Sequence, residues 1–161
     1  MKKVGVFCSN RCPGNLIFAA YDWARYEREK QHLIIVGGFH TSIEKDILSI
    51  LLNGNCLMTV VLARSMHKFR MPTVWKEHAT YGRLQIISPF TQPIHRITKE
   101  TAEQRNETIA NLVDEIIIVH ASQGGKQEQQ CKQWICEGKI VFAMADHENQ
   151  HLFDMGCKPL N

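Results

Sequence analysis

Short apolar runs alternate along this chain with longer segments in which apolar residues recur every three or four positions. The first pattern is typical of buried β-strands and the second of amphipathic helices. We predict strands at residues 4–7, 33–36, 57–62, 84–87, 115–119 and 140–143. Between them we predict helices at about 15–29, 42–52, 72–81, 99–112 and 124–136, followed by a short helix near 149–155.

This alternation predicts an α/β fold, a Rossmann-like three-layer sandwich. We expect a mostly parallel sheet of about six strands with helices on both faces. The 161 residues contain no repeat or linker, so we predict a single domain over residues 1–161. No apolar run approaches the roughly 20 residues that cross a bilayer, and the apolar start at 4–7 is too short for a signal peptide. We therefore predict a cytoplasmic protein that does not contact a membrane.

For two of the predicted helices, the sequence also indicates the capping residue or the buried face. Thr41 is the better cap for the helix at 42–52, because Glu44 follows it by the three positions of a capping box. In the helix at 99–112, the spacing predicts a buried face that includes Ala102, Ile109, Leu112 and Val113.

Ligands of parallel sheets bind beyond the carboxyl ends of the strands, so the strand-to-helix turns are the candidate site. All five turns contain small or hydroxyl residues, and three carry a basic side chain: 8–14, 37–42, 63–65, 88–90 and 121–126. Glycines let backbone N–H groups approach an anion, and the following helix start favours negative charge. No turn matches G-x-G-x-x-G or the Walker pattern, which disfavours dinucleotide and P-loop NTPase chemistry.

Three charged residues near these turns, Arg105, Glu44 and Glu128, each allow two interpretations. Arg105 and Asn106 lie either on a solvated helix face or where the guanidinium reaches a ligand phosphate. Glu44 and Glu128 occupy first helical turns, where a carboxylate either lies close to a ligand or only complements the helix dipole.

Composition narrows the chemistry. The formal net charge of +3 permits phosphate contacts but is not the strongly basic balance of a nucleic-acid-binding domain. Six cysteines show no paired C-x-x-C framework, and only His147 and His151 have the helical spacing of two metal ligands, without an H-E-x-x-H frame. We predict reduced thiols, no metal and no cofactor. No G-x-S-x-G elbow supports a serine nucleophile.

Taken in order, five segments resemble the Rossmann-like core of the DNA-processing protein A (DprA, Smf) family. They are 36–44, 82–90, 104–114, 120–126 and 138–142, and the most specific is Arg-Asn-x-x-Ile-Ala-x-Leu at 105–112. This family belongs to the SLOG superfamily, which also includes lysine-decarboxylase-like phosphoribohydrolases. The chain departs from the family pattern in its first turn, 9–14, and in lacking the flanking helical domains of full DNA-processing proteins.

The resemblance implies a positively charged pocket at the strand ends, single-stranded DNA as its ligand, a recombinase as a partner, and a homodimer. Ten positions carry over, and the strand ends add His40 and Ser88. The candidate phosphate-binding set is thus Ser9, Arg11, Gly37, Gly38, His40, Ser42, Ser88, Arg105, Asn106, Gly124, Gly125 and Lys126.

Two alternatives stay open. The superfamily's enzymes cleave nucleoside monophosphates with a P-G-G-x-G-T-x-x-E motif, which residues 124–128 match only in part, and Glu128 would be the catalytic residue. A protein-partner-binding module with an empty pocket is the second. We favour a non-catalytic module that binds a nucleotide or single-stranded nucleic acid.

Overall fold

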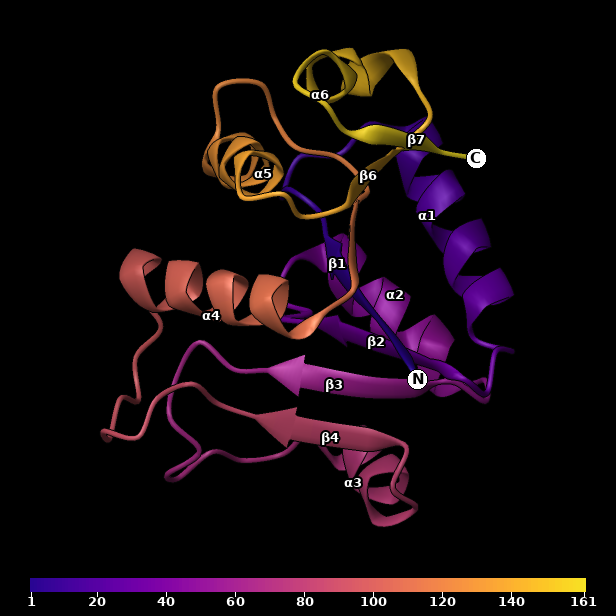
Figure 1. Cartoon of the computed structure of the whole chain (residues 1–161). Helices are drawn as coiled ribbons and strands as arrows, with labels where there is room; N and C mark the ends of the chain where they lie inside the picture. The colour runs from indigo at the N-terminus through magenta and orange to yellow at the C-terminus, as the bar shows by residue number, and fades with distance from the viewer.

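The computed structural model describes residues 1–161 and has a single seven-stranded, all-parallel sheet (Figure 1). Its strands are β1 (Lys2–Phe7), β2 (Leu33–Gly37), β3 (Leu57–Val61), β4 (Leu84–Ile87), β5 (Glu115–Ile118), β6 (Val141–Met144) and β7 (Lys158–Leu160). The helices are α1 (Gly14–Glu27), α2 (Ser42–Leu52), α3 (Thr73–Thr80), α4 (Lys99–Leu112), α5 (Lys126–Cys136), the 3₁₀ turn η1 (His147–Asn149) and α6 (Gln150–Asp154). The predicted Rossmann-like α/β class is confirmed.

The strand count is seven rather than the predicted six. The seventh strand, β7, pairs with β6 from Phe142↔Lys158 to Met144↔Leu160. It escaped prediction because it has only three residues, one of them Pro159, and shows no apolar alternation. An edge position tolerates the proline, which cannot donate a ladder hydrogen bond.

The strand order, β4-β3-β2-β1-β5-β6-β7, places the reversal of the chain between β1 and β5. The chain builds outward from β1 to β4, then crosses back so that β5 pairs with the other side of β1, with Phe7 opposite Ile118. In open parallel sheets this reversal point is where the connecting loops diverge and leave a crevice. The turns after β1 and β5 therefore define where a ligand could lie.

Two hydrophobic cores cover the two faces of the sheet. Val4 and Val6 belong to the core formed with α1, α2 and the residues around α3, while Phe7 and Ile116 belong to the core under α4, α5 and α6. Alternate residues of one strand thus enter opposite cores, as the pleat requires. At about 25 cal/mol per Å² of apolar surface buried, these two layers supply the main stabilisation of the fold.

Helix α4 begins and ends where the sequence predicts, but its buried face is rotated from the expected one. Ile109 is fully buried as predicted, but Leu112 is 38% exposed and Arg105 is only 2% exposed. The apolar pattern could not reveal this face because an arginine occupies it. The start of α4 is fixed by Thr98, whose side chain accepts from the Thr101 N–H in a capping box.

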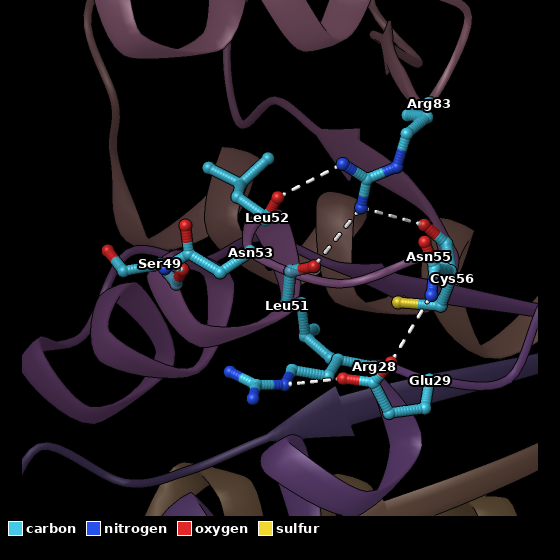
Figure 2. A network of polar contacts seen from close by, with 9 residues as sticks. All are labelled: Arg28, Glu29, Ser49, Leu51, Leu52, Asn53, Asn55, Cys56 and Arg83. Atoms are coloured by element: carbon cyan, nitrogen blue, oxygen red, sulfur yellow. Dashed lines mark hydrogen bonds and ion pairs between the residues drawn. The ribbon is translucent and has the colours of Figure 1, made fainter.

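The connection from α2 to β3 is held by a network of backbone acceptors around two arginines (Figure 2). The Arg83 guanidinium donates to the carbonyls of Leu51, Leu52 and Cys56 at 3.0–3.3 Å, and so satisfies the last carbonyls of α2. Cys56 N–H in turn donates to the Arg28 carbonyl at 2.9 Å.

No helix of the chain is both long enough and apolar enough to span a bilayer.

Candidate phosphate-binding cavity

A cavity of about 590 Å³ opens at the reversal point of the sheet. Its walls come from the turns after β1, β2 and β5 and from the facing sides of α4 and α5: Cys8, Ser9, Asn10, Arg11, His40, Thr41, Lys99, Ala102, Glu103, Arg105, Asn106, Ser122, Gly125, Lys126, Gln127 and Gln130. Only two of these sixteen residues are hydrophobic, so the cavity is suited to a polar ligand.

Arg105 is the buried charge of this cavity. Its Nε donates to Asn106 Oδ1 at 3.1 Å, and its Nη2 lies 3.5 Å from His40 Nε2. No carboxylate oxygen lies within 4.0 Å of the guanidinium, although the side chain is almost completely buried. Burial lowers the pKa of the Arg105 guanidinium, and the nearby Glu44 carboxylate opposes that shift. A desolvated guanidinium with five donors and so few partners is prepared for an anion.

Gly38 is what allows Arg105 to occupy this position. A Cβ at residue 38 would lie 2.7 Å from Arg105 Nε and 2.8 Å from its Cδ, closer than carbon and nitrogen can approach. The next residue, Phe39, has a left-handed backbone (φ 48°) and is buried. Such a conformation costs about 1–3 kcal/mol in a non-glycine residue, and surrounding packing must compensate for it. The Gly38–Phe39 turn thus accommodates the arginine.

A buried carboxylate lies behind the same turn. Thr41 caps α2 as predicted, since its hydroxyl accepts from the Glu44 N–H at 3.3 Å. The Glu44 side chain does not complete the capping box; its Oε1 lies 3.3 Å from His40 Nδ1, and its Oε2 has no hydrogen-bond partner. Glu44 is 1% exposed. The His40 ring therefore approaches the buried Glu44 carboxylate through Nδ1 and the Arg105 guanidinium through Nε2.

Helices α4 and α5 form the opposite wall and are cross-linked to each other. Asn106 Nδ2 donates to Gln130 Oε1 at 2.9 Å, and Lys126 Nζ pairs with Glu103 Oε1 at 2.8 Å. Gln127 Nε2 is buried and has no acceptor. In total, four cations line the cavity (Arg11, Lys99, Arg105 and Lys126), and its one carboxylate is already paired.

The structure brings seven of the twelve predicted residues into this cavity: Ser9, Arg11, His40, Arg105, Asn106, Gly125 and Lys126. Gly37, Gly38, Ser42, Ser88 and Gly124 are not among its lining residues. Ser42 is exposed on the first turn of α2, and Thr41 takes the place at the cavity. Ser88 is occupied in a turn, where its hydroxyl donates to the Arg64 carbonyl at 2.5 Å and accepts from Phe90 N–H.

Sequence reasoning missed most of the α4 and α5 walls. On α4, Lys99, Ala102, Glu103 and Asn106 recur at helical spacing and share the side that faces the cavity. That spacing was readable from the sequence, but it mixes charged, small and polar residues. An apolar-periodicity search does not detect such a face.

Glu128, the catalytic residue of the hydrolase alternative, lies outside the cavity lining. Its Oε1 accepts from the Gly124 N–H at 3.1 Å, and its Oε2 lies 3.5 Å from His151 Nε2. His120, which lies two residues after β5, is buried against Asn149, with 2.8 Å between Nδ1 and Oδ1. Nowhere do three His, Cys, Asp or Glu side chains gather in a way that could hold a metal ion.

A second hollow of about 410 Å³ lies at the opposite, amino-terminal edge of the sheet. Its cations are neutralised: Lys2 pairs with Glu115 at 2.9 Å, and Lys30 pairs with Glu27 at 2.8 Å. Of these two hollows, only the cavity at the reversal point has cations without a carboxylate partner.

These features define a class: a Rossmann-like α/β domain with a cationic cavity at the reversal point of its sheet. The fold is that of DNA processing protein A. The protein from Streptococcus pneumoniae aligns with a TM-score of 0.76 and 22% identity, over 99% of this chain and 58% of that one. The Helicobacter pylori protein aligns with a TM-score of 0.77 and 19% identity, over 98% and 74%. This chain therefore spans a little over half of the Streptococcus protein.

A protein of another name shares the same architecture. The molybdenum cofactor carrier protein of Chlamydomonas reinhardtii aligns with a TM-score of 0.66 and 9% identity, over 99% of this chain and 89% of that one. No family model and no curated protein sequence matches the chain. At these identities the comparisons establish the fold, and function has to be argued from the cavity itself.

Proposed function

We propose that the cavity at the sheet reversal binds the phosphate of a nucleotide or of a single-stranded nucleic acid. One observation carries this proposal: Arg105 is buried, charged and without a carboxylate partner beside an open polar cavity. Burying an unpaired charge is costly, and an anionic ligand would compensate for it. The planar guanidinium can hold two phosphate oxygens at once.

The surroundings of Arg105 support the same ligand. Arg11 and Lys99 are exposed at the rim and make no ion pair, and Gln127 Nε2 offers a buried donor. The N-cap of α5 is Gly125, which has no side chain to cap the helix, so the first N–H groups of α5 are open to an anion. The volume of about 590 Å³ lies within the range of small-molecule sites and accommodates a nucleotide.

The structural neighbours differ in what their names say they bind. The Helicobacter pylori protein is described as binding single-stranded DNA, and the Chlamydomonas protein is a molybdenum cofactor carrier. One fold therefore serves several ligands, and the unpaired cations favour a phosphate-bearing one for this chain. We also keep a homodimer and a recombinase partner as parts of this proposal.

A binding module is favoured over a phosphoribohydrolase. The hydrolase needs a free carboxylate at the cavity, yet Glu103 pairs with Lys126 and Glu128 accepts from Gly124 and approaches His151. Glu44 is buried behind His40.

The test is Arg105→Met, which removes the charge and keeps a similar side-chain volume. We expect thermal shifts with a panel of nucleoside mono- and diphosphates and a short single-stranded oligonucleotide to identify ligands of the wild type. For each such ligand, Arg105→Met should lose affinity by about 30-fold or more, because a charged hydrogen-bond donor is removed. The matched control is Arg25→Met on α1, where the arginine is exposed and pairs with Asp22. Equal affinity in wild type and Arg105→Met, or no ligand that shifts the wild type, would refute the proposal.

A further inference from the structure

Positive charge is concentrated in one third of the chain. Between Asp46 and Glu100 there are seven lysines and arginines and a single acidic residue, Glu77, a net charge of +6. The seven cations are Arg64, Lys68, Arg70, Lys76, Arg83, Arg96 and Lys99. The rest of the chain has twelve cations and fifteen acidic residues, a net charge of −3. The modest overall charge therefore conceals a basic region beside an acidic one.

The seven cations lie between the end of β3 and the start of α4, in the part of the chain that contains α3 and β4, at one edge of the sheet (Figure 1). The loop after β3 and the loop after β4 both leave the carboxyl ends of parallel strands, as the cavity-lining turns do. Ser65 joins the two loops: its N–H donates to the Ile94 carbonyl at 2.8 Å, and its hydroxyl accepts from Ile94 N–H at 3.1 Å. The two loops thus present one surface.

Arg64 connects the two loops through contacts of its guanidinium with residues of both. Its Nε donates to the Ser65 carbonyl at 3.1 Å and its Nη2 to the His67 carbonyl at 2.8 Å, while its guanidinium lies over the Phe69 ring. Nη2 also lies 3.5 Å from His95 Nδ1 in the other loop, and the rings of His67 and His95 are 5.3 Å apart. The loops are therefore held in place before any ligand arrives.

The other cations of these loops, and Lys99 at the start of α4, have no carboxylate partner. Lys68, Arg70, Arg96 and Lys99 are exposed, and none lies within 4.0 Å of a carboxylate. Lys68 also has a left-handed backbone (φ 58°), an uncommon conformation for a lysine. Together with His67 and His95, we call these four cations the basic loop surface.

The basic loop surface is continuous with the cavity. Lys99 belongs to both, and Arg96 precedes it by three residues at the entry to α4. The hollow between α4 and the loop after β4 is lined by Glu100, Glu103 and Glu107 together with Pro89. A polyanion that leaves the cavity toward the loops therefore follows Lys99 and Arg96 and avoids this acidic hollow.

We propose that the basic loop surface is a second binding site for single-stranded nucleic acid, which follows it from the cavity through successive phosphates. The proposal rests on the function proposed above, since one nucleotide of the strand occupies the cavity. A polymer with a phosphate at each step matches unpaired cations that extend from a phosphate site. The exposed rings of His67 and His95 supply faces on which bases stack.

The test is a length series of single-stranded oligothymidylates, from one nucleotide to about 20, measured by fluorescence anisotropy. The loop variant is Lys68→Gln, Arg70→Gln and Arg96→Gln together, none of which makes a hydrogen bond or ion pair through its side chain. The matched control removes the same charge elsewhere, with Lys132→Gln, Lys139→Gln and Lys158→Gln.

Wild type and control should bind more tightly as the oligonucleotide lengthens, up to a plateau. The loop variant should bind a mononucleotide as the wild type does but lose at least about tenfold in affinity for long oligonucleotides. Its slope of log affinity against log salt should fall by about 2, because roughly 0.7 is lost for each single-strand phosphate contact.

Equal length dependence in the loop variant and the control would overturn this inference and leave the cavity function intact. Conversely, unchanged binding in Arg105→Met with loss in the loop variant would refute the cavity and keep the surface. Equal binding of the wild type to an acidic peptide or to anionic phospholipid vesicles, reduced alike in the loop variant, would reject nucleic acid as the specific partner.

Discussion

Arg83 and Arg105 are both drawn into the protein, yet their surroundings are opposite. Arg83 donates to three backbone carbonyls and so closes the end of α2 (Figure 2). It also contacts His78 Nδ1 at 3.1 Å. The Arg105 guanidinium donates to the side-chain oxygen of Asn106, lies 3.5 Å from His40 Nε2 and borders an open cavity. The difference lies in the acceptors: where backbone carbonyls need donors, an arginine stabilises the fold, and where none are present it remains available to a ligand.

The largest expected effect on this comparison comes from replacing each arginine with methionine and measuring denaturant unfolding. Arg83→Met should lower the free energy of unfolding by about 3 kcal/mol, because it leaves the carbonyls of Leu51, Leu52 and Cys56 without their charged donor. Arg105→Met should leave it unchanged or raise it by about 1 kcal/mol, since an apolar side chain replaces a desolvated charge. Comparable losses in the two variants would show that Arg105 is structural too.

A pair of glycines sharpens the comparison. A Cβ at residue 54 would lie 2.5 Å from the Arg28 carbonyl oxygen, so Gly54→Ala should destabilise the α2–β3 connection by about 2 kcal/mol and leave ligand affinity unchanged. A Cβ at residue 38 meets the Arg105 side chain instead, which can move away. Gly38→Ala should therefore cost little stability but reduce affinity for the identified ligand about tenfold, or ~1.4 kcal/mol.

Both glycine variants are read by thermal unfolding and by titration of the ligand. If Gly38→Ala binds as tightly as the wild type, the observed position of Arg105 is not required for binding.

Replacing Glu44 has the smallest expected effect. It tests whether the charge of this carboxylate weakens the binding of an anion to Arg105. Its buried carboxylate repels an anion that approaches Arg105, and one of its oxygens has no hydrogen-bond partner. Glu44→Gln should tighten binding of an anionic ligand by about two- to fivefold, or less than ~1 kcal/mol. Asp46→Asn, exposed on the same helix, serves as the charge-matched control. Weaker binding in Glu44→Gln alone would mean that the carboxylate positions His40 for the ligand.

Much of the secondary structure was predictable because apolar spacing reports directly on burial. The prediction of α4 at 99–112 and of β4 at 84–87 matches the structure to the residue. Failures occurred where burial and apolarity diverge. Leu112 is exposed and Arg105 is buried, and β7 is a strand built around a proline.

The candidate site was predictable in location more than in composition. The turns after β1, β2 and β5 do meet at one cavity, because carboxyl ends of parallel strands share an edge. The sequence could not show which side chain packs against which glycine. Gly38 makes room for Arg105, which lies 67 positions later in the chain. The charge division between residues 47–99 and the rest was present in the sequence and hidden by the net charge of +3.

By itself, the sequence determined the alternation of strands and helices, the capping of α2 by Thr41 and the polar character of the strand ends. These properties depend on neighbours within a few positions, which local chemistry controls. Only the tertiary structure decided that Arg105 is a buried charge without an ionic partner at the cavity. Whether a charged side chain is paired depends on acceptors from distant parts of the chain, and only the folded chain brings those together or leaves them apart.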